Sequence, residues 1–213
     1  ALNLHELFYG VSLQMLTYLD VVLTHAERWL GQRPVPAGAL YFHVHNPVIV
    51  GKNRLSPDEA ETAWLKTYKM KGLVLADSET VRLMDRNMEF GGESPLIPVG
   101  VKKDGSFTKR SSVVSETQWE LLRGYVRTVI RRIGEGITNG DVDIRPYRMG
   151  AKTACDFCPY KPVCQFEPNV AELGYKRLER IETEQMWEAM RAATELRQLP
   201  SGVNDSDGKG GDR

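Results

Sequence analysis

The chain has 213 residues, 41% of them hydrophobic and 26% charged, a composition typical of a globular protein with one sizeable core or a core plus an appendage. Lysine plus arginine and aspartate plus glutamate number 28 each, so any affinity for nucleic acid must come from local basic patches. The sequence has neither an uncharged apolar run of about 18 residues nor a signal-peptide pattern, so we expect a cytoplasmic protein without membrane association.

The first third of the chain predicts alternating helices and strands. Apolar residues recur every three or four positions over residues 4–30, which indicates an amphipathic helix. Aromatic and branched residues at 39–45 predict a short buried strand. A capping-box pattern predicts a helix over residues 56–68, and residues 72–76 predict a second strand.

The remaining elements are mostly helical. A short helix is expected from Ser78, and residues 97–110 resemble a hairpin with Asp-Gly at its turn. A second capping box opens a long helix over residues 115–140, which Asn-Gly ends. The expected division is an α/β (α+β) core over residues 1–140, a cysteine segment over 141–170, a helix over 171–200 and a disordered tail over 201–213.

Three cysteines, Cys155, Cys158 and Cys164, fall within ten residues at C-x2-C-x5-C spacing. A secreted disulfide framework usually has an even number of cysteines spread along the chain, so this cluster favours a reducing compartment and a metal site over free buried cysteines. Zinc sites and cubane clusters both normally take four ligands. The fourth ligand must come from elsewhere, and His43, His45 or a cysteine upstream of the chain could supply it.

Gln14 and Tyr18 are four residues apart and share a face of the first predicted helix. By itself this pair means little, because a tyrosine on an apolar stripe usually packs in the core. In context, residues 9–19, the strand that follows them and the three cysteines closely resemble the nuclease domain of the B subunit of AddAB-type bacterial ATP-dependent helicase-nucleases. This family is RecB-like and belongs to the PD-(D/E)XK nuclease superfamily. The resemblance covers nearly the whole chain.

The resemblance implies part of a restriction-endonuclease-like core, a helix packed on a small mixed sheet, with a helical C-terminal iron-sulfur appendage. Gln14 and Tyr18 would position DNA and the metal-binding carboxylates. Cys155, Cys158 and Cys164 would hold a [4Fe-4S] cluster whose fourth ligand lies far upstream. The implied partners are DNA, Mg2+ and an A subunit, in a complex that resects double-strand breaks.

One family motif is missing from the globular part of the sequence. RecB-like nucleases need a D/E-x-K element to hold a divalent metal, and the only match is Asp207-Gly208-Lys209 in the predicted tail. The family's acidic motifs would lie just before Ala1, where the chain begins without methionine and within a helical pattern. We therefore expect a piece of a longer protein that does not cleave DNA by itself.

Basic residues could contact DNA in two places. Arg123, Arg127 and Arg131 form a ridge on the long helix, and Lys102 and Lys103 decorate the hairpin. They would bind phosphates, although solvated faces are the default interpretation. Three tryptophans are expected to anchor packing and not to stack on bases, namely Trp64, Trp119 and Trp187. No phosphate-binding P-loop occurs, so ATP hydrolysis is not located here. Alternatives are a non-enzymatic module that binds zinc and nucleic acid, or a protein-interaction domain.

Overall fold

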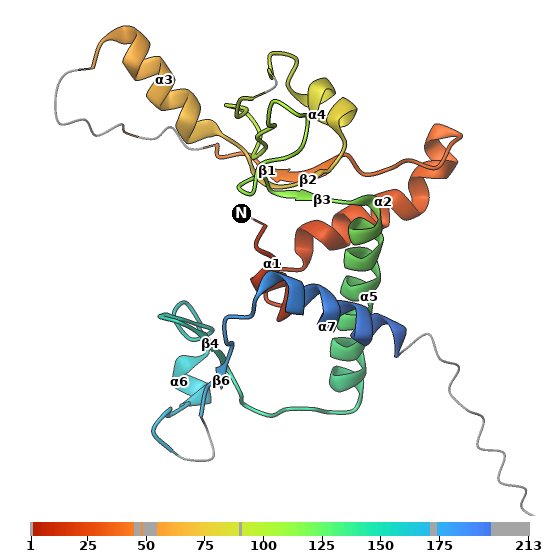
Figure 1. Cartoon of the computed structure of the whole chain (residues 1–213). Coiled ribbons are helices and arrows are strands. Elements are labelled where there is room, and N and C mark those ends of the chain that lie inside the picture. The colour runs from red at the N-terminus through yellow and green to blue at the C-terminus, as the bar shows by residue number, and fades with distance from the viewer. Residues whose placement is uncertain (1, 45–47, 49–54, 90, 171–173, 197–213) are drawn as a thin grey trace, which may run out of the picture.

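The computed structural model describes residues 2–44, 48, 55–89, 91–170 and 174–196 (Figure 1). The helices are α1 (Leu4–Phe8), α2 (Gln14–Leu30), α3 (Pro57–Tyr68), α4 (Ser78–Met84), α5 (Glu116–Thr138), α6 (Lys161–Cys164) and α7 (Thr183–Glu195). The strands are β1 (Gly38–Tyr41), β2 (Lys71–Leu75), β3 (Val113–Val114), β4 (Tyr147–Met149), β5 (Lys152–Thr153) and β6 (Lys176–Arg177). The predicted α/β class, with helices on small mixed sheets, is confirmed.

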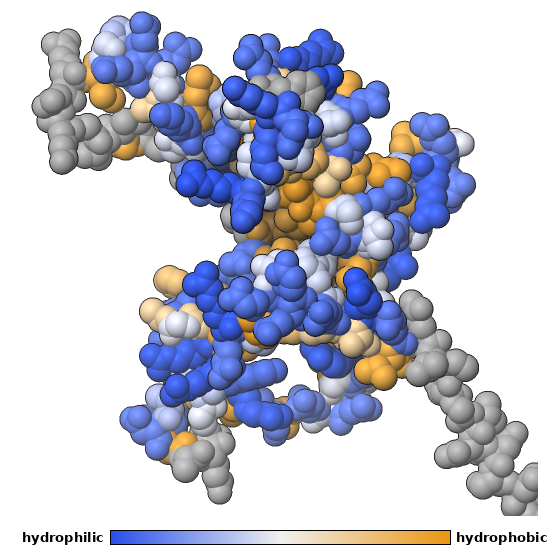
Figure 2. All heavy atoms as spheres, in the orientation of Figure 1, coloured by the Kyte–Doolittle hydropathy of each residue, from blue (hydrophilic) through white to orange (hydrophobic). Residues whose placement is uncertain are grey.

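Two small sheets lie at opposite ends of the molecule, with helices α1, α2, α5 and α7 between them (Figure 1). In the first sheet, of order β1-β2-β3, β2 pairs with β1 antiparallel and with β3 in parallel. The second sheet has the order β5-β4-β6. Figure 2 shows hydrophobic atoms where the first sheet meets the helices and polar atoms over both ends. No helix in the described ranges is long and apolar enough to cross a membrane.

The single helix predicted over residues 4–30 is in fact two helices. Gly10 has a φ of +77°, a left-handed conformation that glycine adopts without steric cost. The amides of Gly10 and Val11 donate to the carbonyls of Leu7 and Glu6, which ends α1 in a Schellman-type motif. The apolar spacing continues through this turn, so periodicity alone could not locate the break.

The first sheet differs from the sequence-based expectation in two places. The strand predicted over residues 39–45 ends at Tyr41, and residue 45 lies outside the described residues. The expected hairpin over 97–110 has the predicted turn but only isolated bridges, such as that between Val101 and Phe107. Strand β3 was not predicted, because two residues are too few for a periodic pattern to show.

The main core lies where α2, α5 and α7 pack together beneath the first sheet. Leu16 of α2 and Trp119, Leu122 and Val126 of α5 are all at most 1% exposed. The capping boxes predicted at Ser56 and Ser115 are both present and start α3 and α5 where expected. Burial of these apolar side chains contributes roughly 1.5–3 kcal/mol each to folding.

The C-terminal part contains less helix than predicted. The helix expected over residues 171–199 begins only at Thr183, and α6 has only four residues. Residues 174–182 instead contribute strand β6 and the connection to α7. The predicted tail, 201–213, lies outside the described residues.

Candidate functional site

Gln14 and Tyr18 lie together on the exposed side of α2. The Gln14 Nε2 atom donates a hydrogen bond of 2.9 Å to the Tyr18 hydroxyl oxygen. The Tyr18 side chain is 59% exposed, so this tyrosine is not part of the core. The pair therefore presents a joined amide and hydroxyl to whatever approaches this face of α2.

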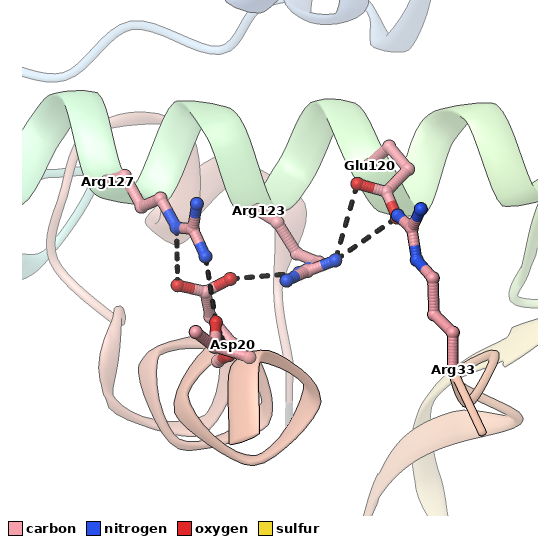
Figure 3. Close-up of polar contacts among 6 residues, drawn as sticks. Asp20, Arg33, Glu120, Arg123 and Arg127 are labelled. Carbon is pink, nitrogen blue, oxygen red and sulfur yellow. Dashed lines mark hydrogen bonds and ion pairs between the residues drawn. The ribbon is translucent and has the colours of Figure 1, made fainter. Parts of the chain in front are cut away.

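A buried carboxylate anchors α2 on another side (Figure 3). Asp20 lies two residues beyond Tyr18, about 200° further around the helix. Its Oδ1 accepts from Arg123 Nε at 2.8 Å and its Oδ2 from Arg127 Nε at 2.6 Å, which joins α2 to α5. Because these two bonds are directional, they fix the rotation of α2 more narrowly than apolar packing can. That rotation sets where Gln14 and Tyr18 point.

Other polar groups complete this network (Figure 3). Arg123 also donates to Glu120, which in turn lies 3.5 Å from Arg33. The hydrogen bond to Asp20 raises the pKa of Arg127, so Arg127 stays charged. Sequence analysis missed Asp20. The signal was present, because a carboxylate four residues after Leu16 sits on the buried side of an amphipathic helix and requires a cationic partner.

The network engages two of the three arginines that were expected to form a basic ridge on α5. The Arg123 side chain is only 14% exposed and Asp20 and Glu120 already bind it. Arg127 is half exposed but also binds Asp20. Arg131, Lys102 and Lys103 are exposed, as a phosphate-binding role requires.

The three cysteines line one cavity of about 510 Å³. Cys155 lies within a tight turn in which the Asp156 carboxylate accepts from the amide and hydroxyl of Thr153, at 2.8 and 2.6 Å. Cys164 ends α6, where its amide donates to Tyr160. All three thiols are free and partly exposed. Tyr175 lines the same cavity, and burial together with the nearby Cys155 thiol raises its pKa.

We define the cysteine lobe as residues 141–170 and 174–182. Among these residues only Leu178 is buried. A segment of this size without its own core usually needs a disulfide or a metal for stability. The lobe contacts α1 and its C-cap residue Tyr9 through the Glu179 backbone carbonyl. The Tyr9 hydroxyl donates to this carbonyl at 2.9 Å, and His5 Nε2 is hydrogen-bonded to it at 2.6 Å. Lys152 also pairs with Glu6 at 3.2 Å.

Cys155, Cys158 and Cys164 share a cavity but do not form a compact set of ligands. No three His, Cys, Asp or Glu side chains within the described residues lie close enough together to hold one metal ion. In a cubane cluster each cysteine binds a different iron, so the cysteine sulfurs lie further apart than the cysteine sulfurs around a single zinc ion. The shared cavity places all three thiols around one space. His43 lines a different cavity and cannot complete this set, and His45 lies outside the described residues.

Comparison with known proteins agrees with the fold. The sequence model of the PD-(D/E)XK nuclease superfamily matches residues 2–165, and the chain belongs to this superfamily. It is 47% identical over 193 residues to the B subunit of the ATP-dependent helicase/deoxyribonuclease of Bacillus cereus (strain G9842). The proteins of the same name from Bacillus mycoides (strain KBAB4) and Bacillus anthracis are each 46% identical over 193 residues. Each alignment covers 90% of this chain and 16% of the relative's length. The resemblance inferred from the sequence is thus confirmed.

Proposed function

We propose that this chain forms the supporting part of the nuclease site in a cytoplasmic ATP-dependent helicase/exonuclease that resects double-strand breaks for recombinational repair. The observation that carries the proposal is the exposed Gln14–Tyr18 pair on a helix of a PD-(D/E)XK nuclease chain. The relatives are named as the B subunit of a helicase/deoxyribonuclease, which supports a complex with an A subunit and DNA as the substrate.

In this proposal Gln14 and Tyr18 position the DNA. The Tyr18 oxygen accepts from Gln14, so its own O–H remains available to donate to a phosphate oxygen. The Gln14 carbonyl and its second N–H are also available to bind DNA or a neighbouring carboxylate. A carboxamide and a phenol are poor general bases at neutral pH, so the pair orients and does not transfer protons. Mg2+, held by carboxylates outside this chain, would supply the activated water.

A metal-dependent exonuclease assay on linear DNA tests this proposal. We use the name complete protein for the longer protein that would contain this chain together with the acidic nuclease motifs. We expect the complete protein to cleave DNA with Mg2+ or Mn2+ and the isolated chain to be inactive. Gln14→Ala in the complete protein should lower kcat by roughly tenfold to a hundredfold, because misplacement near the reacting groups is costly. Val22→Ala, at an exposed position of the same helix, is the matched control and should leave kcat unchanged. Robust cleavage by the isolated chain would contradict the proposal.

We also propose that Cys155, Cys158 and Cys164 bind three irons of a [4Fe-4S] cluster whose fourth ligand lies outside this chain. The shared cavity and the coreless lobe around it support this role. Anaerobic purification should give a brown protein with equal iron and sulfide, whereas a colourless protein with stoichiometric Zn2+ would refute the cluster.

Arg131, Lys102 and Lys103 are the proposed phosphate contacts, which would give salt-sensitive affinity without sequence preference.

A further inference from the structure

A second cavity lies at the open end of the β1–β2 pair, far along the chain from the cysteines. It has a volume of about 400 Å³, within the usual range for ligand sites. Its lining residues are Tyr41, Phe42, His43, Thr67, Lys69 and Lys71. The strand register pairs Tyr41, the last residue of β1, with Lys71, the first residue of β2. The cavity therefore lies between the residues at the end of β1 and the residues that lead from α3 into β2.

Aromatic side chains beside this cavity are exposed and packed on one another. Phe42 stacks on Tyr68 with ring centroids 5.8 Å apart and planes 16° apart. Trp64 meets the edge of Tyr68 at 6.2 Å. Phe42 is 59% and Trp64 43% exposed, so Trp64 does not anchor a core as expected from the sequence. With one face on Tyr68, Phe42 can offer its other face to a flat ligand.

Positive charge lines the same cavity. The extended segment 69–71 alternates, so Met70 packs against a second apolar cluster, which includes Val81 and Ile97, while Lys69 and Lys71 line the cavity. No carboxylate lines the cavity, and no ion pair of the described chain engages either lysine. Their charge is therefore free to bind an anion.

Helix α3 supports this interpretation. It buries none of its residues, although it carries Trp64 and Leu65. Figure 1 shows it projecting from the edge of the sheet, away from the packed helices. The aromatic side chains of α3, Trp64 and Tyr68, therefore form part of the surface around the cavity and not part of the interior.

We infer that this cavity binds single-stranded DNA, with a base stacked on Phe42 and the adjoining phosphates on Lys69 and Lys71. An aromatic platform beside lysines is the combination that single-strand binding uses, because stacking holds any base and cations follow the backbone. Duplex DNA hides the faces of its bases and would not fill the site in this way. The inference deepens the proposed function, on which it rests, by giving the nuclease chain its own contact with the unwound strand.

Photocrosslinking of the complete protein tests the inference even where other DNA sites are present. A single strand carrying 5-iodouracil is irradiated with the protein, without divalent metal so that the strand is not degraded, and adducts are mapped by mass spectrometry. We expect an adduct on the peptide that contains Tyr41 and Phe42. Phe42→Leu should lower its yield at least tenfold, because leucine keeps much of the volume but loses the stacking face, whereas Phe42→Trp should retain it.

Two further variants separate stacking from charge. Lys69→Gln with Lys71→Gln should lower adduct yield and reduce its dependence on salt, since about 0.7 counterions are released per contacted phosphate of a single strand. Trp29→Ala removes another exposed aromatic ring, near the end of α2 and outside the cavity, and should change nothing. Adducts that map only elsewhere, or equal yields from wild type, Phe42→Leu and Phe42→Trp, would overturn the inference. Absence of metal-dependent cleavage by the wild-type complete protein would instead refute the proposed function.

Discussion

The helical core and the cysteine lobe are held together by different forces. In the core, α2, α5 and α7 bury large apolar side chains, and the Asp20 network orders the α2–α5 contact. In the lobe, short strands, turns and a four-residue helix surround a cavity, and almost every described side chain is at least partly exposed. The two regions differ because burial of apolar side chains stabilises the helical core, whereas the described residues of the cysteine lobe bury only Leu178.

The largest expected effect comes from removing the proposed cluster. Chelation or oxidation of the cluster should unfold the cysteine lobe and leave α5 intact, since structural metal sites contribute on the order of 10 kcal/mol. Amide hydrogen exchange of the complete protein measures both regions at once. Val163→Ser changes an exposed side chain of the same segment and is the control, for which we expect wild-type protection. Equal protection of lobe amides with and without metal would show that the two regions do not differ as described.

A change of intermediate size is expected in the core. Asp20→Asn removes the buried anionic partner of the largely buried Arg123, which keeps only its ion pair with the half-exposed Glu120, and such losses cost about 3 kcal/mol. Protection of α5 amides should fall accordingly, while the lobe amides keep their protection. Glu120→Gln is the matched control, because Glu120 belongs to the same network but its side chain is 50% exposed, where ion pairs contribute about 0–1 kcal/mol. An equal loss of α5 amide protection in the two variants would show that the stabilisation by Asp20 does not depend on its burial.

The smallest expected effect depends on pH at the N-cap of α4. The hydroxyl and amide of Thr80 donate to the Asp77 carboxylate at 2.7 and 2.8 Å and lower its pKa. The stabilisation is complete above the pKa of Asp77 in the unfolded chain and is lost as the pH falls through its lower folded-state pKa. An NMR titration should show this depressed midpoint, and Thr80→Val should move it back toward the ordinary value. An unchanged midpoint in Thr80→Val would mean that the hydroxyl is not the cause.

The features that could be predicted from the sequence are those that depend on residues close together in the chain. The capping boxes at Ser56 and Ser115 and the apolar stripe of α5 are local patterns, and the structure has the helices they predict. Gln14 and Tyr18 were singled out by the family resemblance, and their four-residue spacing on a helix predicted that the two side chains lie together, as they do. Such inferences need only one element of secondary structure.

What the sequence could not predict depends on contacts between distant segments. Asp20 meets Arg123 only because α2 packs on α5, and Tyr175 reaches the cavity of Cys155 only because β6 pairs with β4. The platform around Phe42 likewise requires Tyr68, which is brought close when β1 pairs with β2. Neither periodicity nor spacing describes these pairings, because each joins residues from different elements.

The shared Glu179 carbonyl has a consequence for the order in which the molecule assembles. The bonds that reach it from His5 and Tyr9 span 174 and 170 residues, whereas Asp20 and Arg123 are 103 residues apart. Long-range closures are entropically costly and tend to form late. During synthesis, therefore, α2 and α5 can meet while the lobe is still being translated. Docking of the lobe on α1 follows once Glu179 has been translated.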